Sequence, residues 1–173
     1  MLSSHVRHER PALLIALSAL CAAAIAVGPA QSRADPEDWV ILASNSDAAM
    51  GIDRNTIARE DDQATARILM GTFRPEVFDD GSTVSYYVIQ GSFDCRARTR
   101  AEQAVTTYGP TGMLIGSTAA MPESFPVQPG SLTDHILIAA CGGAADGPGF
   151  DRPLDAIAHE RDKRVSEQRP VND

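Results

Sequence analysis

The sequence predicts an α+β domain in which an antiparallel sheet of about six strands packs one face against a C-terminal helix, with a single disulfide joining the two. Six β-prone segments follow one another through connections that are too short for parallel crossovers, which need a dozen or more residues. A capped, strongly apolar helical segment follows the last of them. Two cysteines lie after an N-terminal leader segment and are available to bridge helix and sheet.

The strands are predicted from short apolar runs and from the alternation of apolar and polar residues. Residues 39–43 form an apolar run, a turn-prone Ser-Asn-Ser-Asp follows, and residues 48–52 can return as a hairpin partner. Alternation over residues 64–73 indicates a half-buried strand, which Arg74 and Pro75 are expected to break. The remaining predicted strands are residues 83–93, residues 96–108 and a segment that begins at Met113.

A short helix is predicted after a stretch that contains three prolines. These prolines indicate that residues 121–130 form a loop. Ser131 is placed to accept a hydrogen bond from the amide of Asp134, as an N-cap does, and the helix is expected to run over residues 132–141. A pair of glycines follows and ends it. Because its residues are almost all apolar, the helix should lie mostly buried against the sheet.

The first 34 residues are predicted to be a cleavable signal peptide. Basic residues open the chain, an uncharged run covers residues 11–28, and Ser32-Arg33-Ala34 supplies the small residues of a cleavage site. An uncleaved membrane anchor is the alternative, because the apolar run is long for a signal peptide. Cys21 would suit a lipoprotein, but the bulky Leu20 before it does not fit a lipobox.

Charge argues against nucleic acid as a partner. The whole chain carries a formal charge of −8, and the 139 residues after the leader carry −10, because the leader contains three arginines and one glutamate. Phosphate backbones repel such a chain, so no nucleic-acid binding is expected.

No other apolar segment is long enough to span a bilayer, so no membrane span is expected once the leader is removed.

Two cysteines, Cys95 and Cys141, remain after the leader. In an oxidising compartment such a pair normally forms a disulfide. The bridge would close a loop of about 46 residues, for which the chain-entropy model assigns roughly 4 kcal/mol of stabilisation. The cysteines have neither a CxxC spacing nor a nearby histidine pair, so neither zinc nor a redox centre is expected. The disulfide would tie the helix to the end of a strand.

Residues 143–173 differ in composition from the rest of the chain. Gly, Pro, Asp, Arg and Glu dominate, and Leu154, Ile157 and Val165 are too few to build a core. We therefore expect a flexible, acidic and polar tail, with a frayed helix over residues 153–168 as the alternative.

Arg96, Arg98 and Arg100 are the candidate partner contact. They lie two residues apart on a predicted strand, so their side chains would project from one face as a basic stripe on an otherwise acidic protein. Guanidinium groups in such a stripe would suit a carboxylate-rich or sulfated partner. The alternative is a solvated strand face without a partner.

No catalytic, metal or cofactor site is predicted. Ser131, Asp134 and His135 are close in sequence, but adjacent residues of a helix do not face each other, and no GxSxG motif accompanies them. The acidic pairs at residues 61–62 and 79–80 lack the spacing of a calcium loop and suit turns instead. The protein is therefore not expected to be an enzyme.

Four short motifs follow one another in a particular order. They are Trp39 at the start of an apolar strand, Gly51-Ile52-Asp53-Arg54-Asn55-Thr56-Ile57, Phe93-Asp94-Cys95 before an arginine-bearing segment, and Pro129-Gly130-Ser131 leading a helix to Cys141-Gly142. Over about residues 38–142 the chain resembles the surface-adhesin protein E family of Gram-negative bacteria. The resemblance implies a small exported domain with an antiparallel sheet packed against helix. It also implies a non-catalytic role in binding extracellular matrix and plasma proteins at the cell surface.

Three segments and two functional hypotheses follow. Residues 1–34 form the signal peptide, residues 35–142 the surface-adhesin protein E-like domain, and residues 143–173 the tail. The first hypothesis is an exported, non-catalytic interaction domain that binds a protein of the host matrix. The second is a soluble periplasmic factor for envelope assembly or stability, with a partner in the bacterial envelope. The protein is accordingly expected in the periplasm or at the cell surface.

Overall fold

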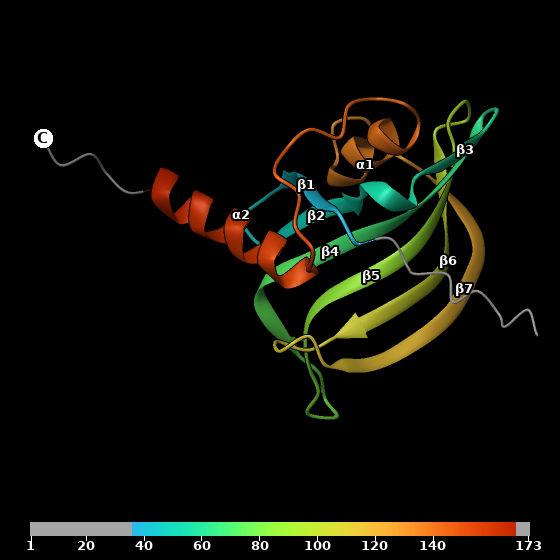
Figure 1. The fold of residues 1–173 in the computed structure, drawn as a ribbon. Helices are drawn as coiled ribbons and strands as arrows, with labels where there is room; N and C mark the ends of the chain where they lie inside the picture. The colour runs from blue at the N-terminus through green and yellow to red at the C-terminus, as the bar shows by residue number, and fades with distance from the viewer. Residues whose placement is uncertain (1–35, 169–173) are drawn as a thin grey trace, which may run out of the picture. The chain divides into compact units, whose positions relative to one another are not determined.

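The computed structural model describes residues 36–168, apart from the side chains of residues 120–122. In this part of the chain seven antiparallel strands form one sheet in the order β1-β2-β4-β5-β6-β7, and β3 pairs with β4 beside that path (Figure 1). The elements are β1 (Trp39–Ser44), β2 (Ala48–Asp53), the 3-10 helix η1 (Arg54–Thr56), β3 (Ala58–Glu60), β4 (Gln63–Val77), β5 (Thr83–Asp94), β6 (Thr99–Tyr108), β7 (Leu114–Pro126), α1 (Leu132–Ala140) and α2 (Pro153–Glu167). The predicted α+β class with an antiparallel sheet is confirmed.

β1 and β2 form the hairpin that the sequence predicts. Asn45 turns the chain, because its side-chain oxygen accepts hydrogen bonds from the backbone amides of Asp47 and Ala48, both at 2.9 Å. The register places Trp39 opposite Asp53. This pairing brings the end of β2 next to the segment that leads into β1.

β4 and β7 continue through prolines that are predicted to interrupt them, and both predictions are wrong. Pro75 lies in β4 between Gly71 and Glu76, where the pairing with β5 shifts register, so the ladder does not need its missing amide. β7 runs to Pro126 along an edge of the sheet, and Pro122 lies at a register shift against β6. Edge strands and bulges tolerate proline because part of their backbone has no ladder partner.

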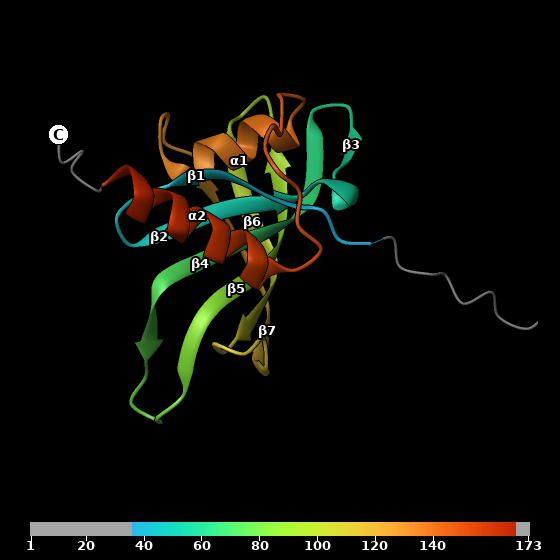
Figure 2. The same cartoon turned by 60° about the vertical axis from the view of Figure 1, so that its left-hand side comes forward.

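The two helices cover opposite faces of the sheet. Ile68 of β4 belongs to a buried cluster that contains Ile136 of α1, whereas the next residue, Leu69, belongs to a second cluster that contains Ala156 of α2. Successive residues of a strand point to opposite faces. α1 and α2 therefore lie on different sides of the sheet, mainly against β1, β2 and β4, and α2 crosses in front of these strands in Figure 2.

The segment after α1 contributes to the core, which corrects the prediction of a flexible, acidic and polar tail over residues 143–173. Residues Pro153–Glu167 form α2, close to the alternative of a helix over residues 153–168. Ile157 of α2 is buried on the sheet. A Cβ atom at Gly71 would lie 2.5 Å from Ile157 Cδ1, so the close approach of this helix to β4 requires glycine. Phe150 and Trp39 also exchange two backbone hydrogen bonds of 2.9 Å. The few apolar residues of this segment are enough to bury one side of α2, because the sheet supplies the other residues of the cluster.

α1 begins and ends as predicted, and the predicted disulfide is confirmed. Ser131 Oγ accepts a hydrogen bond from the amide of Asp134 at 3.2 Å, and Gly142 follows the helix with φ +116°. Cys95 and Cys141 are bonded, with a Cα–Cα distance of 5.6 Å. The bridge joins the turn after β5 to the residue that follows α1, so α1 is covalently attached to the sheet.

Candidate interaction surface

The predicted basic stripe of Arg96, Arg98 and Arg100 does not form. Arg96 and Arg98 lie in a turn after β5, and only Arg100 lies in β6. The Asp94 side chain closes this turn by accepting a hydrogen bond from the amide of Ala97 at 2.7 Å. Such a hydrogen bond between a side chain and the backbone favours a turn over a continued strand. β6 therefore begins at Thr99 and not at residue 96 as predicted.

Each of the three arginines has an acidic neighbour, which further reduces the free charge expected of a stripe. Arg96 is the most open, since 85 % of its side chain is exposed. The pairs are Arg96 with Asp62 at 3.7 Å, Arg98 with Asp134, and Arg100 with Glu102 at 2.8 Å. A role of these arginines in partner binding stays a prediction, and Arg96 is the member best placed for it.

The pair of Arg98 and Asp134 holds α1 in place. The amide of Gly130 donates a hydrogen bond of 2.8 Å to the Asp134 carboxylate and, together with the Arg98 guanidinium, keeps the pKa of that carboxyl below its usual value. The Arg98 carbonyl accepts a hydrogen bond of 2.9 Å from the amide of Val127. The turn after β5 is therefore bound to the start of α1 by the ion pair and to its end by the disulfide.

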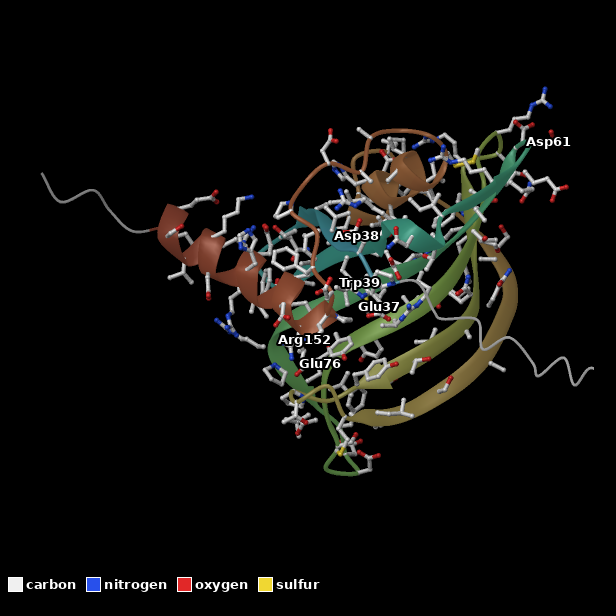
Figure 3. All side chains as sticks on the ribbon, in the orientation of Figure 1. Glu37, Asp38, Trp39, Asp61, Glu76 and Arg152 are labelled. Carbon is white, nitrogen blue, oxygen red and sulfur yellow. A yellow bond between two sulfur atoms is a disulfide. The ribbon has the colours of Figure 1, made fainter. Side chains whose placement is uncertain are left out.

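A network of charged groups joins the start of β1 to the end of β2, where Asp38 lies beside β1 in Figure 3. Asp53 is only 1 % exposed and accepts hydrogen bonds from the amides of Asp38, at 3.0 Å, and Asn55, at 3.2 Å. Arg54 binds the Asp38 carboxylate through two hydrogen bonds of 2.8 Å. The motif at residues 51–57, which the sequence presents only as a family resemblance, thus builds a structural junction.

Arg67 of β4 connects this junction to the core. Its guanidinium binds Glu37 at 2.7 Å and Asp53 at 3.3 Å, and it lies 5.0 Å from the centre of the Trp39 ring. The Trp39 indole in turn donates to Glu37 at 2.8 Å, and Figure 3 shows these two residues close together. In residues 36–168 every buried side-chain nitrogen and oxygen has a partner. The junction therefore stabilises the fold, and its buried polar side-chain atoms are all paired.

The Asp38–Arg54 pair should make part of the stability depend on pH. The hydrogen bond from Arg54 lowers the pKa of the Asp38 carboxyl below its ordinary value of 3.8. A lowered folded-state pKa stabilises the protein above the unfolded-state pKa, and this stabilisation is lost as pH falls through the folded-state pKa. Asp38→Asn should therefore lower the free energy of unfolding at pH 7, by less than about 1 kcal/mol because both side chains are partly exposed.

Urea unfolding at a series of pH values measures this effect. The difference in the free energy of unfolding between Asp38→Asn and the unchanged protein should begin to shrink as pH falls below 3.8, the ordinary pKa of the carboxyl in the unfolded chain. It should vanish once pH has also passed the lowered pKa of the folded state, where the carboxyl becomes neutral. Asp61→Asn is the matched control, because Asp61 is an exposed turn residue with φ +51°, a conformation that asparagine tolerates. A difference that stays constant with pH would contradict the assigned ion pair.

Side chains that could take part in catalysis have structural roles or no hydrogen-bond partner in this part of the chain. Ser131 caps α1 and donates to the carbonyl of Gln128 at 2.7 Å, while His135 is exposed. Tyr86 stacks on Tyr108 with ring centres 4.7 Å apart, and burial raises the pKa of Tyr86 to about 12. Among residues 36–168 no three His, Cys, Asp or Glu side chains lie close enough to hold a metal ion.

Exposed apolar side chains gather at two strand connections that the sequence prediction overlooks. Val77 and Phe78 lie at the end of β4, and Met113 and Leu114 lie at the start of β7, with Val77 74 % and Met113 67 % exposed. Both connections are at the lower end of the sheet in Figure 1. A groove of about 460 Å³ is lined by Phe78 and by Ile115. We call these five residues the apolar tips.

The apolar tips have a signal in the sequence. Val77 and Phe78 directly precede the Asp-Asp-Gly-Ser turn, and residues 113–115 directly follow the Gly-Pro-Thr-Gly turn. Apolar residues beside a turn are usually read as the ends of strands. Their high exposure instead suits contact with another molecule, because neighbouring exposed apolar groups mark interaction sites.

None of the helices in residues 36–168 has both the length and the apolar character required to cross a membrane.

A family model matches residues 39–142, and its description is surface-adhesin protein E. The match begins at the first residue of β1 and ends just after Cys141, so it includes the sheet, α1 and the disulfide but not α2. No curated protein and no solved structure matches the chain. The model covers more than half of the sequence, and the chain therefore belongs to the surface-adhesin protein E family.

Proposed function

We propose that the protein is exported by a signal peptide at residues 1–34 and acts at the cell surface as a non-catalytic interaction protein. Membership in the surface-adhesin protein E family supports adhesion. The observation that carries the proposal is the exposure of the apolar tips, two of which, Phe78 and Ile115, line a groove of about 460 Å³. An interface needs an apolar centre with a polar rim, and Asp79 and Asp80 follow Phe78 to provide such a rim.

The proposed partner is a protein of the host matrix that presents an apolar surface to the tips. The predicted contact through Arg96 would be a separate one, because Arg96 follows the far end of β5 while Phe78 precedes its beginning. Loss of binding at the tips should therefore leave any contact of Arg96 with a carboxylate-rich partner intact.

Binding of the proposed mature protein, residues 35–173, to immobilised matrix proteins tests this role. The double substitution Phe78→Ser and Leu114→Ser should weaken binding by about tenfold or more, since a few buried apolar anchors dominate most interfaces. Ile138→Ser is the matched control, because Ile138 is an apolar residue of α1 that is 45 % exposed and lies outside the tips. Equal binding by all three proteins would contradict the role of the tips.

Labelling of intact cells with a reagent that does not cross the outer membrane tests the location. We expect the protein to be labelled without permeabilisation. Labelling only after permeabilisation, together with capture of an envelope protein and no binding to matrix, would favour the periplasmic assembly or stability factor instead. Detection of residues 1–34 on the native protein by mass spectrometry would contradict cleavage of the signal peptide.

A further inference from the structure

Three arginines gather where α2 approaches the irregular part of β4. Arg74 belongs to β4, and Arg161 and Arg164 belong to α2. Together with Phe73 and Val165 they line a groove of about 220 Å³. The chain as a whole carries a formal charge of −8, so this is a local concentration of positive charge on an acidic protein.

The charge of these guanidinium groups is only weakly neutralised. The acidic neighbour of Arg161 is Asp162, an exposed residue at 3.6 Å. Arg164 lies over the Phe73 ring at 5.8 Å and reaches a carboxylate only through Ser44, whose hydroxyl accepts from Arg164 at 3.2 Å and donates to Glu160 at 2.7 Å. Within the described residues, no carboxylate forms an ion pair with Arg74 or Arg164. The groove can therefore accept anionic groups.

A second groove, of about 330 Å³, continues along α2. It shares Phe73 and Arg161 with the first and adds the apolar side chains of Leu154 and Ile157. Asp155 also lines it, but Arg152 already binds that carboxylate with hydrogen bonds of 2.7 and 2.8 Å. We call the two connected grooves the α2 groove. It presents cationic and apolar groups along one side of the helix.

We propose that the α2 groove binds an acidic segment of a partner protein that carries an apolar side chain between its carboxylates. Guanidinium groups match carboxylates in geometry and charge, so Arg74, Arg161 and Arg164 would hold the acidic side chains. Phe73 and Val165 would contact the apolar one. This lining favours a peptide over a sulfated glycan, which carries its charges without comparable apolar side chains.

The site is independent of the proposed adhesion through the apolar tips. None of the five apolar tips lines either part of the α2 groove, and Arg161 and Arg164 lie on α2, outside residues 39–142 that the family model matches. The negative charge of the rest of the chain repels an acidic segment that is not aligned with the groove, which restricts binding to this surface. Substitution of Arg161 on α2 should therefore leave binding at the tips unchanged.

Fluorescence anisotropy with a labelled hexapeptide of alternating glutamate and leucine tests the proposal. The peptide should bind the purified protein at low salt and should bind more weakly as salt screens the charges. A hexapeptide of alternating glutamine and leucine should bind far more weakly. Absence of binding by the glutamate peptide, or equal binding by the two peptides, would overturn the proposal.

Arg161→Gln and Lys163→Gln form a matched pair of variants. The two side chains are 54 % and 53 % exposed on the same helix, but only Arg161 lines the groove. Arg161→Gln should raise the Kd of the glutamate peptide by about threefold to fivefold, and Arg161→Gln combined with Arg74→Gln by about tenfold. Lys163→Gln should leave the Kd unchanged. Equal losses in Arg161→Gln and Lys163→Gln would show a general charge effect and overturn the assigned site.

Val165→Ser separates a peptide from a glycan. Val165 is 52 % exposed, so its replacement should keep the circular dichroism spectrum and weaken binding of the glutamate and leucine peptide. A heparin oligosaccharide is the competing probe. Tighter binding of this oligosaccharide than of the peptide, dependent on Arg74 and Arg161 and insensitive to Val165→Ser, would replace the proposed peptide ligand by a sulfated glycan.

Discussion

Replacement of both Cys95 and Cys141 by serine is expected to lower the free energy of unfolding by about 4 kcal/mol. The disulfide closes a loop with a sequence separation of 46, and its loss returns that loop entropy to the unfolded chain. The ion pair between Arg98 and Asp134 still holds α1 in the variant, so the folded state should keep its secondary structure. The loss is therefore large without a change of fold.

Urea unfolding measures this loss. The midpoint should fall, and the slope of free energy against urea should rise, because an unfolded chain without the cross-link exposes more surface. The unchanged protein in a reducing agent is the control, and it should behave like the double variant. A loss below about 1 kcal/mol would mean that the unfolded chain is already compact without the disulfide.

Ile157→Ala is expected to lower the free energy of unfolding by about 2 to 5 kcal/mol, the cost of emptying a well-packed apolar site. Ile157 fills the space above Gly71 and packs in the cluster of α2 with Trp39. Val165→Ala is the matched control on the same helix. Val165 is 52 % exposed, so its replacement should change the stability by less than about 0.5 kcal/mol.

The fluorescence of Trp39 reports the state of α2 directly. It is the only tryptophan of the chain and is fully buried in the cluster beneath α2. If the helix separates from the sheet in Ile157→Ala, the emission should shift to the red while the far-ultraviolet signal of the strands remains. Equal stabilities of Ile157→Ala and Val165→Ala would contradict the packing of α2 on the sheet.

Local chemistry made several elements predictable. Asn45 turns the first hairpin with its own side chain, and Ser131 caps α1 through a bond to an amide three residues later. Cys95 and Cys141 bridge as expected, because an oxidised pair needs only to meet in the fold. Each of these features depends on a residue type whose hydrogen bonding or covalent chemistry can be recognised locally, so a single sequence predicts them.

Features that depend on distant neighbours were not predictable. Pro75 is expected to end a strand because it has no backbone N–H to donate. β4 nevertheless continues through it, at a shift in register against β5. Arg98 would continue a strand by alternation, yet it lies in a turn and pairs with Asp134 from α1. The apolar tips and the α2 groove arise in the same way, from segments that only the fold brings together.

By itself the sequence determined the α+β class, the antiparallel pairing, the capped helix and the disulfide, because turn residues, alternation and cysteines act within short stretches of chain. The tertiary structure alone decided that a second helix covers the other face of the sheet. Ile157 has too few apolar neighbours in sequence to predict burial, and it is buried because Gly71 and Trp39 supply the opposing surface from strands more than 80 residues away.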